Sequence, residues 1–519
     1  MNELTRTEYS ARNTTVAIIS RVIAILMGYG VRVVFTAVLS ASYVGVSGLF
    51  TDIVTILSLS ELGMETAITF ALYEPIAHKN IEKIKSIMAL YRKLYTVVAL
   101  VIIGIGLALM PFLGLIISDP GDVSDITLIY AIYLANTALS YFFIYRKTLM
   151  DASQIRYVGV AWHTLFLVVQ DVGQILVLLL TKNFILFLLI YLACTLFYNL
   201  ATSHSAVKRY PYLKEKEVKE LPAEERKGIF KNIRAMLMHK VGDIIVNNTD
   251  NILLSAMTGL MNAGIYANNF LIFSSVRQVL NEIFNSITAS VGNLSVTEDE
   301  KRAKKIFDCA FFIDQWLTGF ASICIFMLLS PFCVLSFGKI YGYGFFPMLV
   351  IVLNFYVTGM RRATIVYRDA CGLFYYDRYK AVAEALINLV SSVLFTLWLG
   401  FIGVFIGTFV SAMLTSFWVE PFVLYKYKLR APLSGYFKSY AIYAAVFGLC
   451  CFLTSRGCRL LEGWIGIRET DLLPMILLRL IVCIVFVNLF YLLCFFRKKE
   501  FKLVLEKARF ILEKRRRKK

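Results

Sequence analysis

Charged residues are scarce in this 519-residue sequence. Asp, Glu, Lys and Arg make up only 17% of it, while 58% is hydrophobic and the mean hydropathy is +0.68. A soluble chain of this length would divide into several domains with charged surfaces, so the composition excludes that class. The short alternating segments of a transmembrane β-barrel are also missing. The class that remains is an all-α polytopic membrane protein.

Motifs for catalysis and metal binding are missing as well. No P-loop is present, which argues against ATP hydrolysis by this chain. The ten cysteines have no metal-ligand spacing, and the four histidines form no HExxH pattern. The longest outer loop, about 456–472, is shorter than the active-site segments of most membrane glycosyltransferases and polymerases, and no nucleophile–base pair is evident. We therefore expect neither an enzyme nor a cofactor.

The sequence does contain apolar runs that recur from end to end. Each is long enough to cross the hydrocarbon core of a bilayer, which is about 30 Å thick. We predict fourteen spans: 13–40, 44–74, 89–117, 125–149, 158–181, 184–205, 230–258, 262–292, 309–335, 342–371, 380–400, 402–424, 438–455 and 473–496.

The distribution of basic residues predicts the orientation of these spans. With the N-terminus inside, 44 of the 54 Lys and Arg residues lie on the cytoplasmic side and five on the opposite side. The positive-inside rule then places both termini in the cytoplasm. The net charge of +19 thus comes mostly from basic residues that set the membrane orientation, and it does not indicate nucleic-acid binding. We expect the basic tail to lie against anionic membrane lipids.

Two halves of the chain resemble each other. The motif YVGVSGLF (43–50) returns as NAGIYANNF (262–270), and a YR pair followed ten residues later by RY occurs at 145–157 and at 367–379. Six spans per half make the repeat parallel. The predicted organisation is an N-lobe of helices 1–6 (1–207), a cytoplasmic linker (208–229), a C-lobe of helices 7–12 (230–430), helices 13 and 14 (431–496) and a basic tail (497–519).

Five basic residues fall inside predicted spans, where charge is costly. Arg21 and Arg32 are eleven residues apart, which puts them on one face of the first helix, about 16 Å apart along its axis. The offset of 219 residues between the outer turns makes Lys240 equivalent to Arg21. Arg277 and Arg479 complete the set. Arginine binds phosphate oxygens well, so the basic residues of helices 1, 7 and 8 favour an anionic substrate.

Other polar side chains follow the same helices. Glu61 and Glu65 share a face of the second helix. The seventh helix carries Asp243, Asp250, Asn247 and Asn251 on one side. The acids either bind a coupling ion, Na⁺ or H⁺, or form structural salt bridges with the arginines. We expect the asparagines to line a cavity shared by helices 1, 2, 7 and 8, together with one from the eighth helix: Asn247, Asn251 and Asn281.

Structural alternatives exist for several of these basic residues. Arg21 and Arg32 are also explained by side chains that reach the two membrane interfaces, and Arg277 by an ion pair with Glu61 or Glu282. Three arginines end the tenth helix, and we interpret at least one of them as an interface anchor: Arg361, Arg362 and Arg368.

The motifs together resemble the polysaccharide transporter branch of the MOP exporter superfamily. The similarity rests on YVGVSGLF, on SELGMETAITFALYEP (60–75), on YRKTLMDASQIRYV (145–158) and on the segment 372–408, and it covers nearly the whole chain. It implies a Wzx-type flippase that moves an undecaprenyl-pyrophosphate-linked oligosaccharide across the bacterial cytoplasmic membrane for capsule, O-antigen or related polymers. Implied partners are this lipid-linked oligosaccharide, membrane lipids, a polysaccharide polymerase and other assembly proteins, with a monomeric chain.

Other functions remain open in a defined order. Helices 13 and 14 are similar to the extra pair of lipid II flippases, but the second helix carries glutamates where those proteins have arginines. A MATE-type drug antiporter comes next, although four basic residues in the cavity would repel organic cations. A membrane glycosyltransferase or polymerase comes last. In the favoured mechanism Arg21 and Lys240 hold the pyrophosphate on the cytoplasmic side, and movement of the lobes passes it to Arg32.

Overall fold

The computed structural model describes residues 6–58, 64–153, 155–215, 218–285, 300–371, 373, 376–377 and 379–506, without most side chains between 231 and 248. All regular structure in these ranges is helical. It forms two compact units, Met1–Gly264 and Ile265–Lys519. The predicted class, an all-α polytopic protein, is confirmed.

Ten helices in the described ranges are long and apolar enough to cross a membrane, and one bent pair adds an eleventh. A helix satisfies its backbone hydrogen bonds internally, as hydrocarbon requires. The three other predicted spans, 44–74, 230–258 and 262–292, coincide with helices that are shorter or more polar. The chain is therefore an integral membrane protein.

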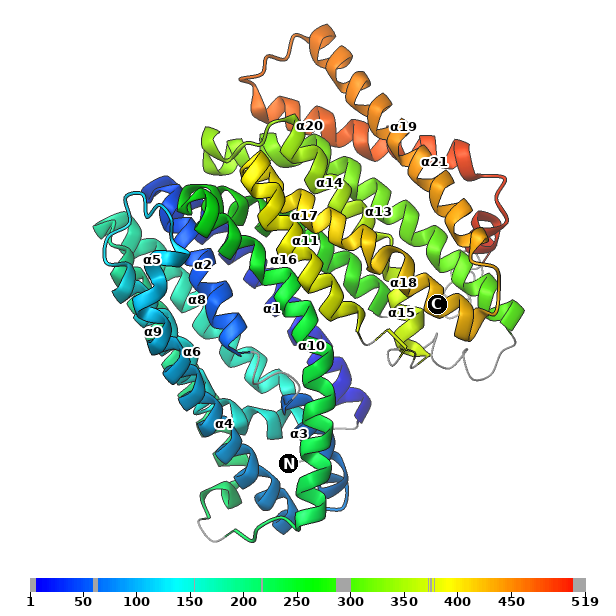
Figure 1. Cartoon of the computed structure of the whole chain (residues 1–519). Helices are drawn as coiled ribbons and strands as arrows, with labels where there is room; N and C mark the ends of the chain where they lie inside the picture. Colours follow the sequence, from blue (N-terminus) through cyan, green and yellow to red (C-terminus); the bar gives the residue numbers. More distant parts are fainter. Residues whose placement is uncertain are drawn as a thin grey trace. The chain divides into compact units, whose positions relative to one another are not determined.

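In unit 1, α1 packs along α8, α8 along α9, α9 along α6 and α6 along α4, while α2 contacts α1, α4 and α6 (Figure 1). Side chains of Asn80 and Asn183 cap the starts of α4 and α9. The helices are α1 (Arg6–Val38), α2 (Ala41–Leu57), α3 (Met64–Ala77), α4 (Ile81–Leu109), α5 (Leu113–Ile116), α6 (Ile126–Tyr141), α7 (Ile144–Ala152), α8 (Arg156–Thr181), α9 (Phe184–Arg209) and α10 (Ala223–Thr258).

Unit 2 contains most of α11 (Leu260–Asn285) and all later helices. They are α13 (Glu300–Phe337), α14 (Phe345–Gly359), α15 (Arg362–Ala370), α16 (Lys380–Leu399), α17 (Phe401–Leu414), α18 (Ser416–Leu424), α19 (Ser434–Ile465), α20 (Leu472–Val482) and α21 (Asn488–Phe495). A single π-helical turn, Tyr425–Leu429, follows α18, and another, Cys483–Val487, joins α20 to α21.

The two units repeat the same packing order. In unit 1 the order is α4, α6, α9, α8, and in unit 2 it is α13, α14, α17, α16. These helices occupy equivalent positions along the two halves of the sequence. A broken helix also recurs: α6 and α7 meet at an angle of 44°, and a short break separates α14 from α15. The packing is what two copies of one helical unit would produce.

Helix α10 packs against α2 and α3, so unit 1 extends to Gly264. The sequence repeat places the start of the second lobe earlier, at residue 230. The two boundaries differ because one follows the repeated sequence and the other follows packing.

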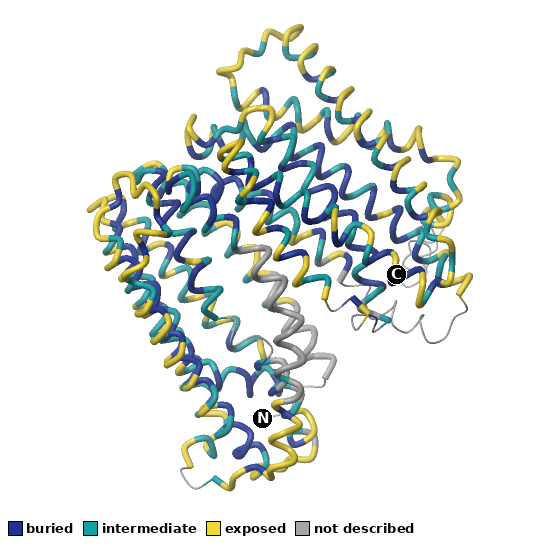
Figure 2. Tube along the Cα trace, viewed as in Figure 1, coloured by how far each residue is buried: buried dark blue, intermediate teal, exposed yellow. Residues whose placement is uncertain are grey.

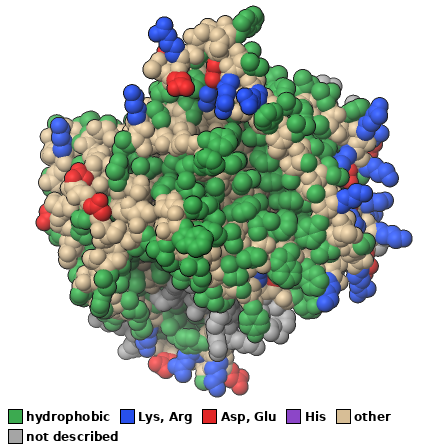
Figure 3. All heavy atoms as spheres, turned by 45° about the horizontal axis from the view of Figure 1, so that its top comes forward, with side chains coloured by type: hydrophobic (Ala, Val, Ile, Leu, Met, Phe, Trp, Pro, Cys, Tyr) green, Lys and Arg blue, Asp and Glu red, His purple; other side chains and the backbone are tan. Residues whose placement is uncertain are grey.

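Burial separates the helices of unit 2 into two groups. Figure 2 shows α13 and α14 mostly buried or intermediate, whereas about half of the positions in α19 and α20 are exposed. The exposed positions on α19 and α20 are mostly apolar, as on a surface that faces lipid. On the face shown in Figure 3, hydrophobic side chains dominate and lysine and arginine lie mainly towards its borders.

Candidate functional site

A polar pocket of about 410 Å³ lies within unit 1, between α6, α7, α8 and α9. The bend between α6 and α7 lies at its wall, where Phe143 and Ile144 line it. The lining combines amides, hydroxyls and aromatic rings, among them Asn136, Gln170, Asn199, Thr137, Ser140, Thr195, Thr202, Tyr191, Tyr198 and Phe166.

The pocket carries little net charge. Lys147 alone among its lining residues is permanently charged, and its Nζ lies 3.7 Å from Oδ2 of Asp151. The His163 ring packs edge-on against Tyr198, with 5.4 Å between the ring centroids. The pocket therefore offers a strongly charged ligand group only one lysine, which is already paired with Asp151.

A line of hydroxyl groups and rings leads from this pocket to α2. The Tyr191 ring lies 6.4 Å from the ring of Tyr133, whose hydroxyl is 2.7 Å from Oγ of Ser47. The Arg32 guanidinium acts electrostatically on the same Tyr133 hydroxyl. Arg32 itself is half-buried on α1.

The chemistry of the pocket suits a neutral, polyhydroxylated group. Amides and hydroxyls both donate and accept hydrogen bonds, and aromatic faces supply flat apolar surfaces. The Oδ1 atom of Asn136 is buried without a partner among the described residues. Such an atom is available to a ligand or a water molecule, because a buried acceptor is costly to leave unpaired.

The structure separates the two arginines of the first helix by environment. Arg21 is exposed on α1, and Arg32 is half-buried. The predicted common face on one continuous helix is compatible with α1, which spans both residues. Binding of pyrophosphate by this face stays a prediction.

The amide of Asn251 on α10 donates a 2.6 Å hydrogen bond to Asp52 on α2. Asp52 was not among the predicted site residues. Asp250, the residue before Asn251, is buried. Glu65 lies at the start of α3 and acts electrostatically on Asp151. Glu61 and the side chains of Lys240, Asp243 and Asn247 lie outside the described residues.

In unit 2, Arg277 lies over the Phe270 ring, 5.6 Å from its centroid. The predicted cavity residue Asn281 accepts a 2.6 Å hydrogen bond from Nε of Arg362. Arg362 also pairs with Asp314 at 3.3 Å, and both side chains are buried. Asn281 is therefore engaged by a buried ion pair that the sequence did not reveal.

The arginines that end the tenth predicted span are not interface anchors. Arg361 donates to both carboxylate oxygens of the fully buried Glu420, and Arg368 pairs with Asp377 and Glu420. Lys380 joins the same carboxylate. Three basic groups around one buried carboxylate make an internal ion-pair cluster, because an isolated buried charge would be far too costly.

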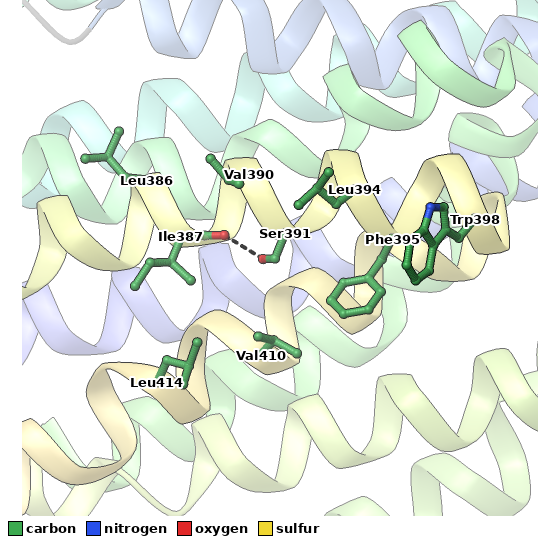
Figure 4. Close-up of a pocket in the computed structure, with 9 residues that line it drawn as sticks. All are labelled: Leu386, Ile387, Val390, Ser391, Leu394, Phe395, Trp398, Val410 and Leu414. Atoms are coloured by element: carbon green, nitrogen blue, oxygen red, sulfur yellow. Dashed lines mark hydrogen bonds between the residues drawn. The ribbon is translucent and has the colours of Figure 1, made fainter.

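An apolar groove of about 480 Å³ lies between α16 and α17 of unit 2. Ser391 is its one polar lining residue, and its hydroxyl donates to the carbonyl of Ile387 (Figure 4). Figure 4 shows Leu386, Val390, Leu394 and Trp398 along α16. This groove offers nothing to a polar substrate group.

Comparison by sequence gives no match, either to protein-family models or to curated proteins. Comparison by structure does give matches. The chain is similar to a structure described as the lipid II flippase MurJ in an inward closed conformation, with a TM-score of 0.64, 14% identity and coverage of 92% of this chain and 98% of that chain.

Two further solved structures share this architecture. One is an inward-facing multidrug resistance MATE family transporter of the MOP superfamily, with a TM-score of 0.58 and 14% identity over 77% of this chain and 94% of that one. The other is a MOP superfamily transporter from Pyrococcus furiosus, with a TM-score of 0.52 and 13% identity over 82% and 96%. The chain therefore has the fold of MOP-superfamily transporters.

Proposed function

We propose that the protein is a flippase that moves an undecaprenyl-pyrophosphate-linked oligosaccharide across the bacterial cytoplasmic membrane. It acts by alternating access in the synthesis of capsule, O-antigen or a related surface polysaccharide. The protein is then a transporter and not an enzyme, with both termini in the cytoplasm.

The observation that carries this proposal is the polar pocket of unit 1. It places amides, hydroxyls and aromatic rings, with little net charge, inside a bundle of membrane-spanning helices. Sugars need such donors, acceptors and flat faces. The fold supports the same kind of function, since its solved examples include a structure described as a lipid II flippase.

We assign the pyrophosphate to basic residues predicted inside the spans, beginning with Arg32. Arg32 acts on Tyr133, which leads through Tyr191 to the pocket wall. A guanidinium near a sugar-sized pocket fits a substrate that joins a glycan to a diphosphate. Arg21, Lys240 and Arg277 complete the proposed set, and the lipid chain stays in the bilayer.

A reconstituted assay tests the proposal. Proteoliposomes would contain undecaprenyl-pyrophosphate disaccharide or a phospholipid, each with the same fluorescent label, and dithionite would bleach the outer leaflet. We expect protein-dependent exchange of the disaccharide lipid and not of the phospholipid. Equal exchange of both lipids, or none above that of empty liposomes, would refute the proposal.

Lipid II is the second candidate substrate. The likeness to the MurJ structure covers 92% of this chain and 98% of that chain. This chain also has an α19–α20 pair beyond the repeats. The same assay with a pentapeptide on the disaccharide separates the two candidates. Exchange that requires the peptide would make lipid II the substrate.

We also propose that Na⁺ or H⁺ drives the cycle through the predicted acidic residues Glu61, Glu65, Asp243 and Asp250. Asp250 is buried on α10, and Glu65 lies at the start of α3. Imposed sodium and proton gradients should change the exchange rate in the same proteoliposomes. If neither gradient has an effect, this part of the proposal is wrong.

A further inference from the structure

A second polar pocket, of about 230 Å³, lies within unit 2 between α13, α14, α19 and α20. None of the residues predicted to bind substrate lines it. Two arginines do, Arg459 from α19 and Arg479 from α20, together with Ser455. The pocket is therefore a separate feature of the C-terminal helix pair.

A proline in α13 creates part of this pocket. Pro331 has no N–H group, so the carbonyl of Met327, four residues earlier, lacks its helical donor. Nη1 of Arg479 donates to that carbonyl at 3.2 Å. Nε and Nη2 of the same side chain donate to the two carboxylate oxygens of Glu462, at 2.6 and 3.2 Å. These contacts use three of the five N–H groups of the guanidinium, and two remain for a ligand.

Arg459 supplies the unbalanced charge. It lies four residues after Ser455, so both side chains share one face of α19. Arg459 is exposed and forms no ion pair with any residue that the structure describes. Glu462 balances Arg479, so the group of three charged side chains keeps a net charge of one positive unit.

The depth of the pocket matches the level of lipid headgroups. Arg479 lies seven residues after the first residue of α20, about 10 Å along the helix. Trp464, near the end of α19, is 87% exposed, and Phe345 of the pocket wall is 56% exposed. Exposed tryptophan near a helix end is typical of the membrane–water interface.

We propose that this pocket binds the phosphate group of an anionic membrane phospholipid. Arg459 and the two unused N–H groups of Arg479 donate to the phosphate oxygens, and the hydroxyl of Ser455 lies on the same face of α19. Arginine suits this role because its planar donors match phosphate geometry. The site is independent of the transported substrate, so it stands or falls separately from the proposed flippase activity.

Lipid titration of the purified full-length protein tests the proposal. Native mass spectrometry would measure the fraction that holds one dioleoylphosphatidylglycerol, with dioleoylphosphatidylcholine as the zwitterionic comparison. We expect preference for phosphatidylglycerol. Arg459→Gln should weaken it about tenfold, the effect of losing one charge-assisted contact.

Arg456→Gln is the matched control. Arg456 lies three residues earlier on α19, is also exposed, and lies over the Phe452 ring at 5.4 Å instead of lining the pocket. It should bind phosphatidylglycerol as the unchanged protein does. The proposal would be overturned if both variants lost phosphatidylglycerol binding equally, or if Arg459→Gln lost none. Displacement of the lipid by equimolar inorganic phosphate would make the site one for free anions and overturn its assignment to lipid.

Discussion

Gly45 on α2 and Gly264 on α11 pack backbone against backbone. A Cβ added to Gly45 would lie 2.0 Å from the carbonyl oxygen of Leu260, and a Cβ added to Gly264 would lie 2.0 Å from that of Ala41. In each pair the same 219 residues separate equivalent positions, Gly45 from Gly264 and Ala41 from Leu260. The contact is therefore symmetric with respect to the sequence repeat.

This contact predicts that Gly264→Ala destabilises the protein. The new methyl group would meet backbone atoms, which cannot rotate away, and overpacking of this kind costs about 1–3 kcal/mol. Thermal unfolding in detergent measures the effect. Gly104→Ala on α4 is the control, because nothing lies within 4 Å of the added Cβ. A melting temperature for Gly264→Ala equal to that of the control would contradict the packing.

The Arg362–Asp314 pair predicts a large loss of stability when one partner is removed. Arg362→Gln leaves the fully buried Asp314 carboxylate without its cation, and breaking a buried pair costs about 3–5 kcal/mol. The double variant Arg362→Gln with Asp314→Asn should recover much of this loss, since no lone charge remains. Chemical or thermal unfolding distinguishes the three proteins. Additive losses in the double variant would show that the two groups do not interact.

The pocket of unit 1 predicts a defect in transport without a defect in folding. Tyr191→Phe combined with Tyr198→Phe removes two hydroxyl groups and keeps both rings, so the packing should survive. We expect at least a fivefold slower exchange of the disaccharide lipid, roughly the net contribution of one hydrogen bond. Tyr427→Phe, in the π-helical turn outside the pocket, should transport normally. Unchanged exchange in the double variant would remove the pocket from the substrate path.

Arg32 is the predicted phosphate-binding residue that acts electrostatically on Tyr133, a neighbour of the pocket residue Tyr191. Arg32→Ala should reduce surface polymer about tenfold or more at normal protein levels, because a charge-assisted contact to the diphosphate is lost. Arg456→Gln serves as the control for a change of charge elsewhere. Undiminished polymer with Arg32→Ala would exclude this role for Arg32.

The fold was largely predictable from apolar run length and from the repeat. Eleven of fourteen predicted spans are helices or helix pairs of sufficient length and hydropathy, and the YR motifs lie in the two short helices that follow the broken spans. Periodicity and length carry this information locally. The packing of α10 against α2 depends on contacts that no local pattern encodes.

The buried ion pairs were missed for a specific reason. The prediction used the basic residues inside spans, whereas the signal for buried ion pairs lies in the acidic residues inside spans. Asp52, Asp314 and Glu420 each lie within a predicted span, and each has a hydrogen-bonded partner in the structure. A charged group in hydrocarbon needs a partner. An acidic residue in a span therefore signals an internal pair, and it would have shown that Arg361 and Arg362 face inwards.

The bond between Arg479 and the Met327 carbonyl also concerns motion. Withdrawal of α20 from α13 would leave the Met327 carbonyl without a donor, because Pro331 has no N–H group to supply one. This bond holds α20, and with it the α19–α20 pair, against α13. In a transport cycle of rocking bundles, α19 and α20 would travel with α13 as one rigid body, and any lipid held beside Arg459 would be carried along with them.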